Sequence, residues 1–220
     1  MHVGVTLPKS NFCKIIMLTL MVCTLFIGLG VYALSVVAQT KETIEIRQTT
    51  VPLLLNSGEV QTKEAEVSIL LWFENGDIPH ETWTKRPTPD WVWTYNELQT
   101  GSEKTAATLS GHQLIDKNEE SNLYKWYNTM VPELAKTGGL IYLDERVDQA
   151  MDISAYLSKT NALPAQWALI GNLLSIAAYQ NDFMTSVLAG PDRINIQMLS
   201  RGKNTEGRTV LAIPALLTEF

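Results

Sequence analysis

Hydrophobic and polar side chains change their spacing several times along the chain, and each spacing predicts a different element. The longest apolar stretch, Ile15–Ala38, has 24 residues and no charged side chain. At about 1.5 Å per helical residue it is long enough to cross a hydrocarbon core of about 30 Å. Lys9 and Lys14 precede it, and no acidic residue does. The pattern therefore predicts a single-pass membrane anchor with an extracytoplasmic C-terminal part, or a signal peptide cleaved near Ala38.

Downstream of this leader (residues 1–38), the first half mixes strand-like runs with breakers. Gln39–Thr50 is polar and β-branched, which predicts that residues 39–64 form a stalk or an opening strand, and residues 65–220 are expected to form the exported domain. Val67–Phe73 predicts a buried strand because it is a continuous apolar run followed by a turn dipeptide. The segments Trp91–Tyr95 and Lys104–Leu109 alternate as strands do.

Helical spacing is clearest in the second half. Apolar side chains recur at this spacing along Leu123–Leu134, and the two glycines at 138 and 139 are a natural helix stop. After a short apolar strand at Leu140–Leu143, we expect Asp144 to cap a second helix that keeps one apolar face as far as Leu157. Asn161 and Pro164 then end that helix.

Three further strands are predicted before the C-terminus, at Leu173–Tyr179, Arg193–Ser200 and Thr209–Ile213. Helices followed by a run of neighbouring strands favour an α+β fold, in which an antiparallel sheet is covered by helices on one face. The N-terminal hydrophobic helix is additional to this domain.

Charge and cysteine usage narrow the possible partners. The leader holds two of the 17 basic residues and none of the 23 acidic ones, so the remainder carries a net charge of −8. An acidic domain repels the phosphate backbone, and we expect no nucleic-acid partner. Cys13 and Cys23 both lie in the leader. The exported part therefore has no disulfide framework and no thiolate metal site.

Trp91, Trp93 and Tyr95 are the candidate binding residues. If residues 91–95 form a strand, these three side chains point to one face, and Val92 and Thr94 point to the other. One interpretation is a stacking platform for sugar rings or an apolar peptide. The other is the core face of the sheet, and it is favoured because Val92 alone is too little to anchor the opposite face.

No motif indicates catalysis, and we expect no catalytic residue, metal or cofactor. Asp77, His80 and Glu81 lie close together, but a metal site needs ligands that converge from different elements. There is also no G-x-S-x-G nucleophile elbow. The alternative is an enzyme acting on cell-wall glycan or peptide, with two carboxylates about 5 to 9.5 Å apart in a cleft. Its candidate carboxylates are Asp77, Glu81, Asp144 and Glu145.

The C-terminal region resembles a known family. A strand with serine and aromatic residues (Ser175–Phe183) is followed by an alternating strand that ends in Arg (Arg193–Arg201), and then by a terminal segment, Thr209–Phe220. That segment carries Pro214, Thr218, Glu219 and Phe220. The run covers about 45 residues and is similar to the closing segment of the YwmB family.

Members of that family are exported proteins whose fold is described as similar to that of the TATA-box-binding protein. The resemblance implies that fold and brings no catalytic residues, and a shared fold does not imply DNA binding. Together with the leader, it leads us to expect a non-catalytic domain held at the cell membrane through residues 15–38. Its expected partner is another envelope protein.

The predicted topology can be checked by labelling intact cells with an amine reagent that does not cross membranes. Lys117 and Lys159 should be modified, because they follow the leader, whereas Lys9 should be protected on the cytoplasmic side. Labelling of Lys9 with protection of the two downstream lysines would contradict export.

Overall fold

The computed structural model describes residues 52–99, 105–202 and 207–217. These residues belong to one compact unit, Thr50–Phe220. The apolar segment at residues 15–38 and both cysteines lie outside the described residues. Within the described ranges, no helix has both the length and the apolar character needed to cross a bilayer.

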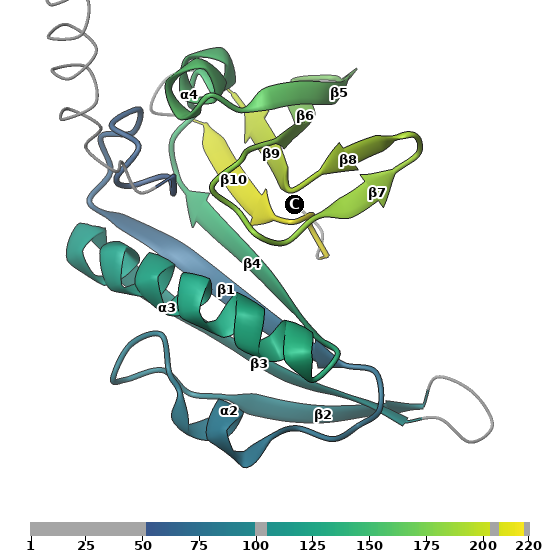
Figure 1. The fold of residues 1–220 in the computed structure, drawn as a ribbon. Coiled ribbons are helices and arrows are strands. Elements are labelled where there is room, and N and C mark those ends of the chain that lie inside the picture. Colours follow the sequence, from purple (N-terminus) through teal and green to yellow (C-terminus); the bar gives the residue numbers. More distant parts are fainter. Residues whose placement is uncertain (1–51, 100–104, 203–206, 218–220) are drawn as a thin grey trace, which may run out of the picture. The chain divides into compact units, whose positions relative to one another are not determined.

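One antiparallel sheet of eight strands dominates this unit (Figure 1). Every neighbouring pair of strands runs antiparallel. The described residues therefore have the α+β character expected from the sequence. In spatial order the strands are β2 (Thr94–Gln99), β3 (Thr105–Asp116), β1 (Glu64–Phe73), β4 (Gly139–Val147), β10 (Arg208–Ile213), β9 (Ile196–Arg201), β6 (Leu173–Tyr179) and β5 (Leu163–Ile170). A small separate hairpin joins β7 (Val187–Ala189) to β8 (Asp192–Ile194).

Helix α3 (Lys117–Lys136) lies along one face of the sheet and contacts β3 and β4 (Figure 1). It begins at a capping box, in which the Asp116 carboxylate accepts from the backbone N–H of Glu119 and the Glu119 side chain accepts from that of Asp116. Its apolar stripe, buried against the sheet, is Leu123, Tyr127, Met130 and Leu134. The predicted helix at these positions is confirmed.

Buried and more exposed side chains alternate along β1 and β4, so one face of each strand is buried. In β1 the odd-numbered side chains from Ala65 to Phe73 are buried in the core, whereas the even-numbered ones from Glu64 to Trp72 point to the opposite face. The same alternation in β4 buries Ile141 and Leu143. The sheet thus has a helix-covered face and, beneath β1 and β4, an open face.

The helix expected to start at Asp144 is wrong. Residues 144–147 continue β4, because Asp144 is paired with both Ser68 of β1 and Ala212 of β10. Helix α4 (Ile153–Thr160) begins later, where the Asp152 carboxylate accepts from the N–H of Ala155. The predicted end is confirmed, since Asn161 adopts the left-handed conformation at the helix terminus.

The strand predicted at residues 91–95 is also wrong over its first half, since β2 starts at Thr94. Trp91 is only 1% exposed and packs on Gly111 of β3. A Cβ at residue 111 would lie 2.5 Å from the Trp91 Nε1 atom, so only glycine allows this approach. The expectation of one face shared by the three aromatics depended on a strand that does not form there.

The compact unit also reaches further toward the N-terminus than the expected boundary at residue 65. Leu53, Leu54 and Leu55 are fully buried members of the hydrophobic core. We call residues 52–60 the N-terminal strap, because they lead into β1 without belonging to a helix or strand. The strap therefore packs into the core of the compact unit.

The burial of Trp91 can be tested by comparing the effects of alanine substitutions at Trp91 and at its neighbour Val92, which is 72% exposed. Trp91→Ala should lower the free energy of unfolding by about 3 to 5 kcal/mol, since it deletes a buried aromatic ring. Val92→Ala, the matched control, should change it by less than about 0.5 kcal/mol. Urea unfolding measures both, and equal effects of the two substitutions would contradict the packing described.

Candidate functional site

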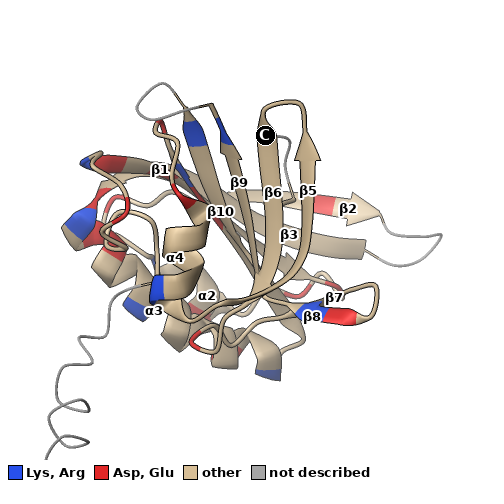
Figure 2. Cartoon of the chain, turned by 90° about the horizontal axis from the view of Figure 1, so that it is seen from above, with Lys and Arg blue, Asp and Glu red and all other residues tan. Residues whose placement is uncertain are grey.

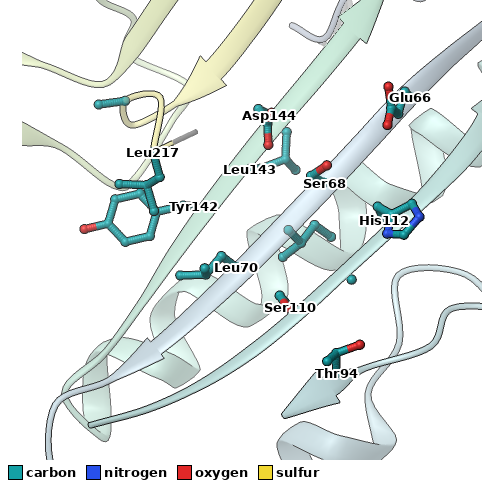
Figure 3. A pocket seen from close by; sticks show the side chains of 13 residues that line it. Glu66, Ser68, Leu70, Thr94, Ser110, His112, Tyr142, Leu143, Asp144 and Leu217 are labelled. Atoms are coloured by element: carbon teal, nitrogen blue, oxygen red, sulfur yellow. The ribbon is translucent and has the colours of Figure 1, made fainter. Parts of the chain in front are cut away.

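A hollow of about 420 Å³ lies on the open face of the sheet (Figure 3). Its side chains come from β1, β3, β4, the start of β2 and the segment after β10. They are mostly hydroxyl-bearing or ionisable: Glu66, Ser68, Leu70, Thr94, Ser110, His112, Tyr142, Asp144 and Leu217. A second hollow of about 400 Å³ shares Glu66 and His112 and continues to Arg146 and Arg208. We call the two together the open-face groove.

Ion pairs occupy several of the charged groups in this groove. Asp144 accepts from Arg146 at 2.8 Å from Nε and 2.7 Å from Nη2. Arg208 Nε lies 3.4 Å from an oxygen of Asp148. Burial raises the pKa of Asp144, and the guanidinium of Arg146 opposes that effect without cancelling it. The groove therefore offers hydroxyls, two ion pairs, and the side chains of Glu66 and His112 to a ligand.

The carboxylates considered for catalysis do not converge on this groove. Asp144 lines it, but Glu145 follows it in the strand and points to the opposite, buried face. Asp77 and Glu81 lie between β1 and the end of α2 (His80–Thr84), outside both hollows. Among the described residues, no three His, Cys, Asp or Glu side chains form a group that could hold a metal ion.

The predicted aromatic site is dispersed. Trp91 lies in the core, and Trp93 packs beside it with ring centroids 5.6 Å apart. Tyr95 is exposed on β2 and lies next to Trp83, at 5.7 Å between ring centroids. Of the three residues, only Tyr95 is exposed, at 41%, so they do not form a common stacking platform.

A different feature, which the sequence analysis did not identify, is the edge strand β5. All eight of its residues are exposed, including Trp167 at 76% and Leu169 at 63%. It pairs with β6 on one side only. No charged residue occurs between Lys159 and Asp182, and Figure 2 shows the β5–β6 hairpin without a blue or red segment. This uncharged run is the signal in the sequence that could have revealed it.

A buried pair of carboxyl groups fixes the N-terminal strap. Glu120 is in the first turn of α3 and Glu145 is in β4, and both side chains are inaccessible to solvent. Glu145 accepts from the backbone N–H of Leu54 at 2.7 Å, and Glu120 accepts from that of Leu55 at 2.6 Å. Glu120 also accepts from the N–H of Asn56 at 2.9 Å. Three successive backbone donors thus form a nest around two carboxyl groups.

The two carboxyl groups are coupled by their burial and by a hydrogen bond between their side chains. Burial raises the pKa of Glu145 well above its usual value, and the negative charge of Glu120 raises it further. Glu145 therefore keeps its proton to higher pH than a free carboxyl group does, and it is hydrogen-bonded to Glu120, whose own pKa is also raised by burial. Tyr156 of α4 extends this network by donating to the Pro52 carbonyl at 2.6 Å. The pair holds the strap in place and has no access to a substrate.

A comparison with models of protein families finds no match to this sequence, and a comparison with curated proteins finds none either.

The carboxyl pair predicts how stability depends on pH. Because the folded-state pKa of Glu145 is raised, the native state holds a proton that the unfolded chain loses at about pH 4.5. The free energy of unfolding should therefore fall as pH rises above about 4.5, until the folded-state pKa is passed. Glu145→Gln should remove this contribution, since an amide can donate to Glu120 and accept from Leu54 without titrating. The other oxygen of Glu145 lies 3.4 Å from the Leu55 nitrogen, whose short bond of 2.6 Å is to Glu120, so an NH₂ group there displaces only a long contact.

The matched variant is Glu120→Gln. Both oxygens of Glu120 accept from backbone donors, so an amide NH₂ faces a donor in either orientation and should cost about 1 to 3 kcal/mol. Urea unfolding across pH 5 to 9 separates the two variants. Equal destabilisation by both, or an unchanged pH slope in Glu145→Gln, would contradict the assignment of the raised pKa to Glu145.

Proposed function

We propose that this chain is a non-catalytic domain of the cell envelope that acts by binding protein, and that its contact surface is the outer edge of β5. The observation that carries the proposal is the exposure of all eight residues of this strand, with large apolar side chains and no charge. An exposed edge presents unpaired backbone N–H and C=O groups together with alternating side chains. A partner strand can satisfy both, which is the basis of recognition by strand addition.

The large apolar side chains of β5 remain exposed in the folded domain and do not contribute to its core. Trp167, Leu169 and Ile170 are each more than three-fifths exposed; Trp167 and Leu169 share one face of the strand, and Ile170 lies beside them on the other. Contiguous apolar surface of this kind marks interaction sites in soluble domains. The opposite edge, β2, is more polar and carries Glu97, so it is the weaker candidate for contact with a partner.

The proposal includes attachment to the membrane through residues 15–38, or secretion after cleavage near Ala38, as the leader predicts. It also includes the likeness to the YwmB family and to the fold of the TATA-box-binding protein. The antiparallel sheet with α3 packed along it supports that likeness. The net charge of −8 after the leader argues against DNA as a ligand.

The competing proposal, an enzyme of cell-wall glycan or peptide, has less support. It requires two carboxylates facing one cleft. Of the four considered, only Asp144 lines the open-face groove, and Arg146 holds it in an ion pair. No cofactor or metal enters either proposal.

The proposal is tested by photo-crosslinking in intact cells. A photoreactive amino acid placed at Leu169 of β5 should form protein adducts, because this side chain would lie in the interface. The same group at Leu98 of the opposite edge is the matched control, since Leu98 is also exposed. Trp167→Glu should abolish the adducts at Leu169 by placing a charge in the apolar contact. Adducts of equal yield at Leu98, or no effect of Trp167→Glu, would contradict the proposal.

A further inference from the structure

We infer that the strand that pairs with β5 is the β5 strand of a second copy of this chain, joined antiparallel about a twofold axis at Ala168. This inference rests on the proposed function, in which β5 is the contact surface. It adds the identity and the register of the partner.

Local geometry limits the part of β5 that is free to pair. The register of the β5–β6 ladder shifts between Pro164 and Gln166, which interrupts a regular edge. The Gln166 side chain donates to the Ala189 carbonyl at 2.7 Å and to Asp192 at 3.0 Å, so the β7–β8 turn lies against this end. Proline also lacks a backbone donor. The regular, unpaired part of the edge is therefore Gln166–Ile170.

Antiparallel self-pairing of this segment matches its side chains well. With Ala168 on the twofold axis, Trp167 of each copy lies opposite Leu169 of the other. Both side chains point to the same face of the strand, because they are two residues apart. The small Ala168 side chain meets its own copy on the other face. Aromatic–aliphatic cross-strand pairs stabilise a sheet by roughly 0.2 to 1 kcal/mol each, and this register forms two of them.

Charge makes this edge suitable for contact between two copies. Residues after the leader carry a net charge of −8, so two copies repel each other over most of their surface. The 22 residues between Lys159 and Asp182 carry no charge, and they include the whole β5–β6 hairpin (Figure 2). Two copies can therefore approach edge to edge here with the least electrostatic cost.

Symmetry distinguishes pairing of β5 with β5 from pairing of β5 with β2 of a second copy. Pairing of β5 with β5 uses the same surface on both copies and closes as a dimer. Pairing of β5 with β2 of another copy would leave a free β5 and a free β2 at the ends, and would continue into a fibre. It would also place the apolar β5 against the polar residues of β2, which include Asn96 and Glu97.

The size of the contact predicts a weak dimer. The exposed parts of Trp167, Leu169 and Ile170 amount to on the order of 700 Å² for two copies, from typical areas of such side chains. Stable interfaces bury about 1,200 to 2,000 Å². We therefore expect association that depends on concentration, and anchoring of both copies in one membrane would raise their local concentration.

Cysteine crosslinking of the full chain in membranes of expressing cells tests the register. Cys13 and Cys23 are first replaced by serine, so that each variant carries one cysteine. Opposed residues in an antiparallel pair have Cα atoms about 4.5 to 5.5 Å apart, which suits a disulfide. After oxidation, Ala168→Cys should give the highest yield of a species at twice the mass of the chain. The yield should fall for Gln166→Cys and Ile170→Cys, and Leu98→Cys is the control on β2.

Co-expression of Trp167→Cys with Leu169→Cys gives an independent readout, because the proposed register opposes these two positions. Their mixed dimer should exceed either dimer formed alone. Equal yields at positions 98 and 168, or no preference for the mixed pair, would overturn the inference. A disulfide or photo-adduct with a different protein at β5 would overturn the second copy as partner and leave the proposed function standing. No adduct of any kind at β5 would overturn both.

Discussion

The eight-stranded sheet is much wider than the helices that pack on it, and this difference determines where the core of the domain forms. Eight strands spaced about 4.8 Å apart make a sheet roughly 34 Å wide, whereas one helix with its side chains covers only about 10 to 12 Å. The 20-residue α3 lies over β3, β1 and β4, and its apolar stripe completes the core there. α4 has eight residues, and only Ile153, Tyr156 and Leu157 of them are buried. The helices therefore do not extend over the whole width of the sheet, and the edge strand β5 is left exposed.

Two features of the molecule follow because the helices cover only part of the sheet. The N-terminal strap supplies Leu53, Leu54 and Leu55 to the core beside α4, in place of a further helix. Its irregular backbone needs buried acceptors, and the Glu120–Glu145 pair provides them. At the far edge the β7–β8 turn contacts β5 at Gln166, and none of the described residues covers the Trp167–Ile170 end. Natural edge strands are commonly protected by charges, proline or bulges, and β5 has the proline and the bulge at its beginning only. The Trp167–Ile170 end is unprotected, which is the physical basis for assigning the contact surface to it.

The sequence predicted the elements whose side chains face the core. The core-facing residues of β1 and α3 repeat with the period of their element, and both were found with the correct type. The helix predicted to start at Asp144 was wrong for a physical reason. An isolated acidic residue after an apolar run is typical of a helix cap, but here β4 pairs with β1 on one side and with β10 on the other, and this pairing extends the strand to Val147. Trp91 and Trp93 alternate like a strand but lie in a connecting segment, because Trp91 fills the space above Gly111. β5 was missed because an edge strand exposed on all sides has no buried face to produce a periodic pattern. The paired roles of Glu120 and Glu145 arise from contacts across 25 residues and had no local signal.

Amide hydrogen exchange of the full chain in lipid vesicles, compared at low and high protein density, tests most directly whether β5 is an open edge that pairs. At low density the amides of both edge strands should exchange rapidly, since each strand has one unpaired side. At high density the amides of Gln166–Ile170 should exchange more slowly, with Thr94–Gln99 of β2 unchanged. Exchange at Gln166–Ile170 that is independent of density, or slowing of equal size in β2, would contradict the account.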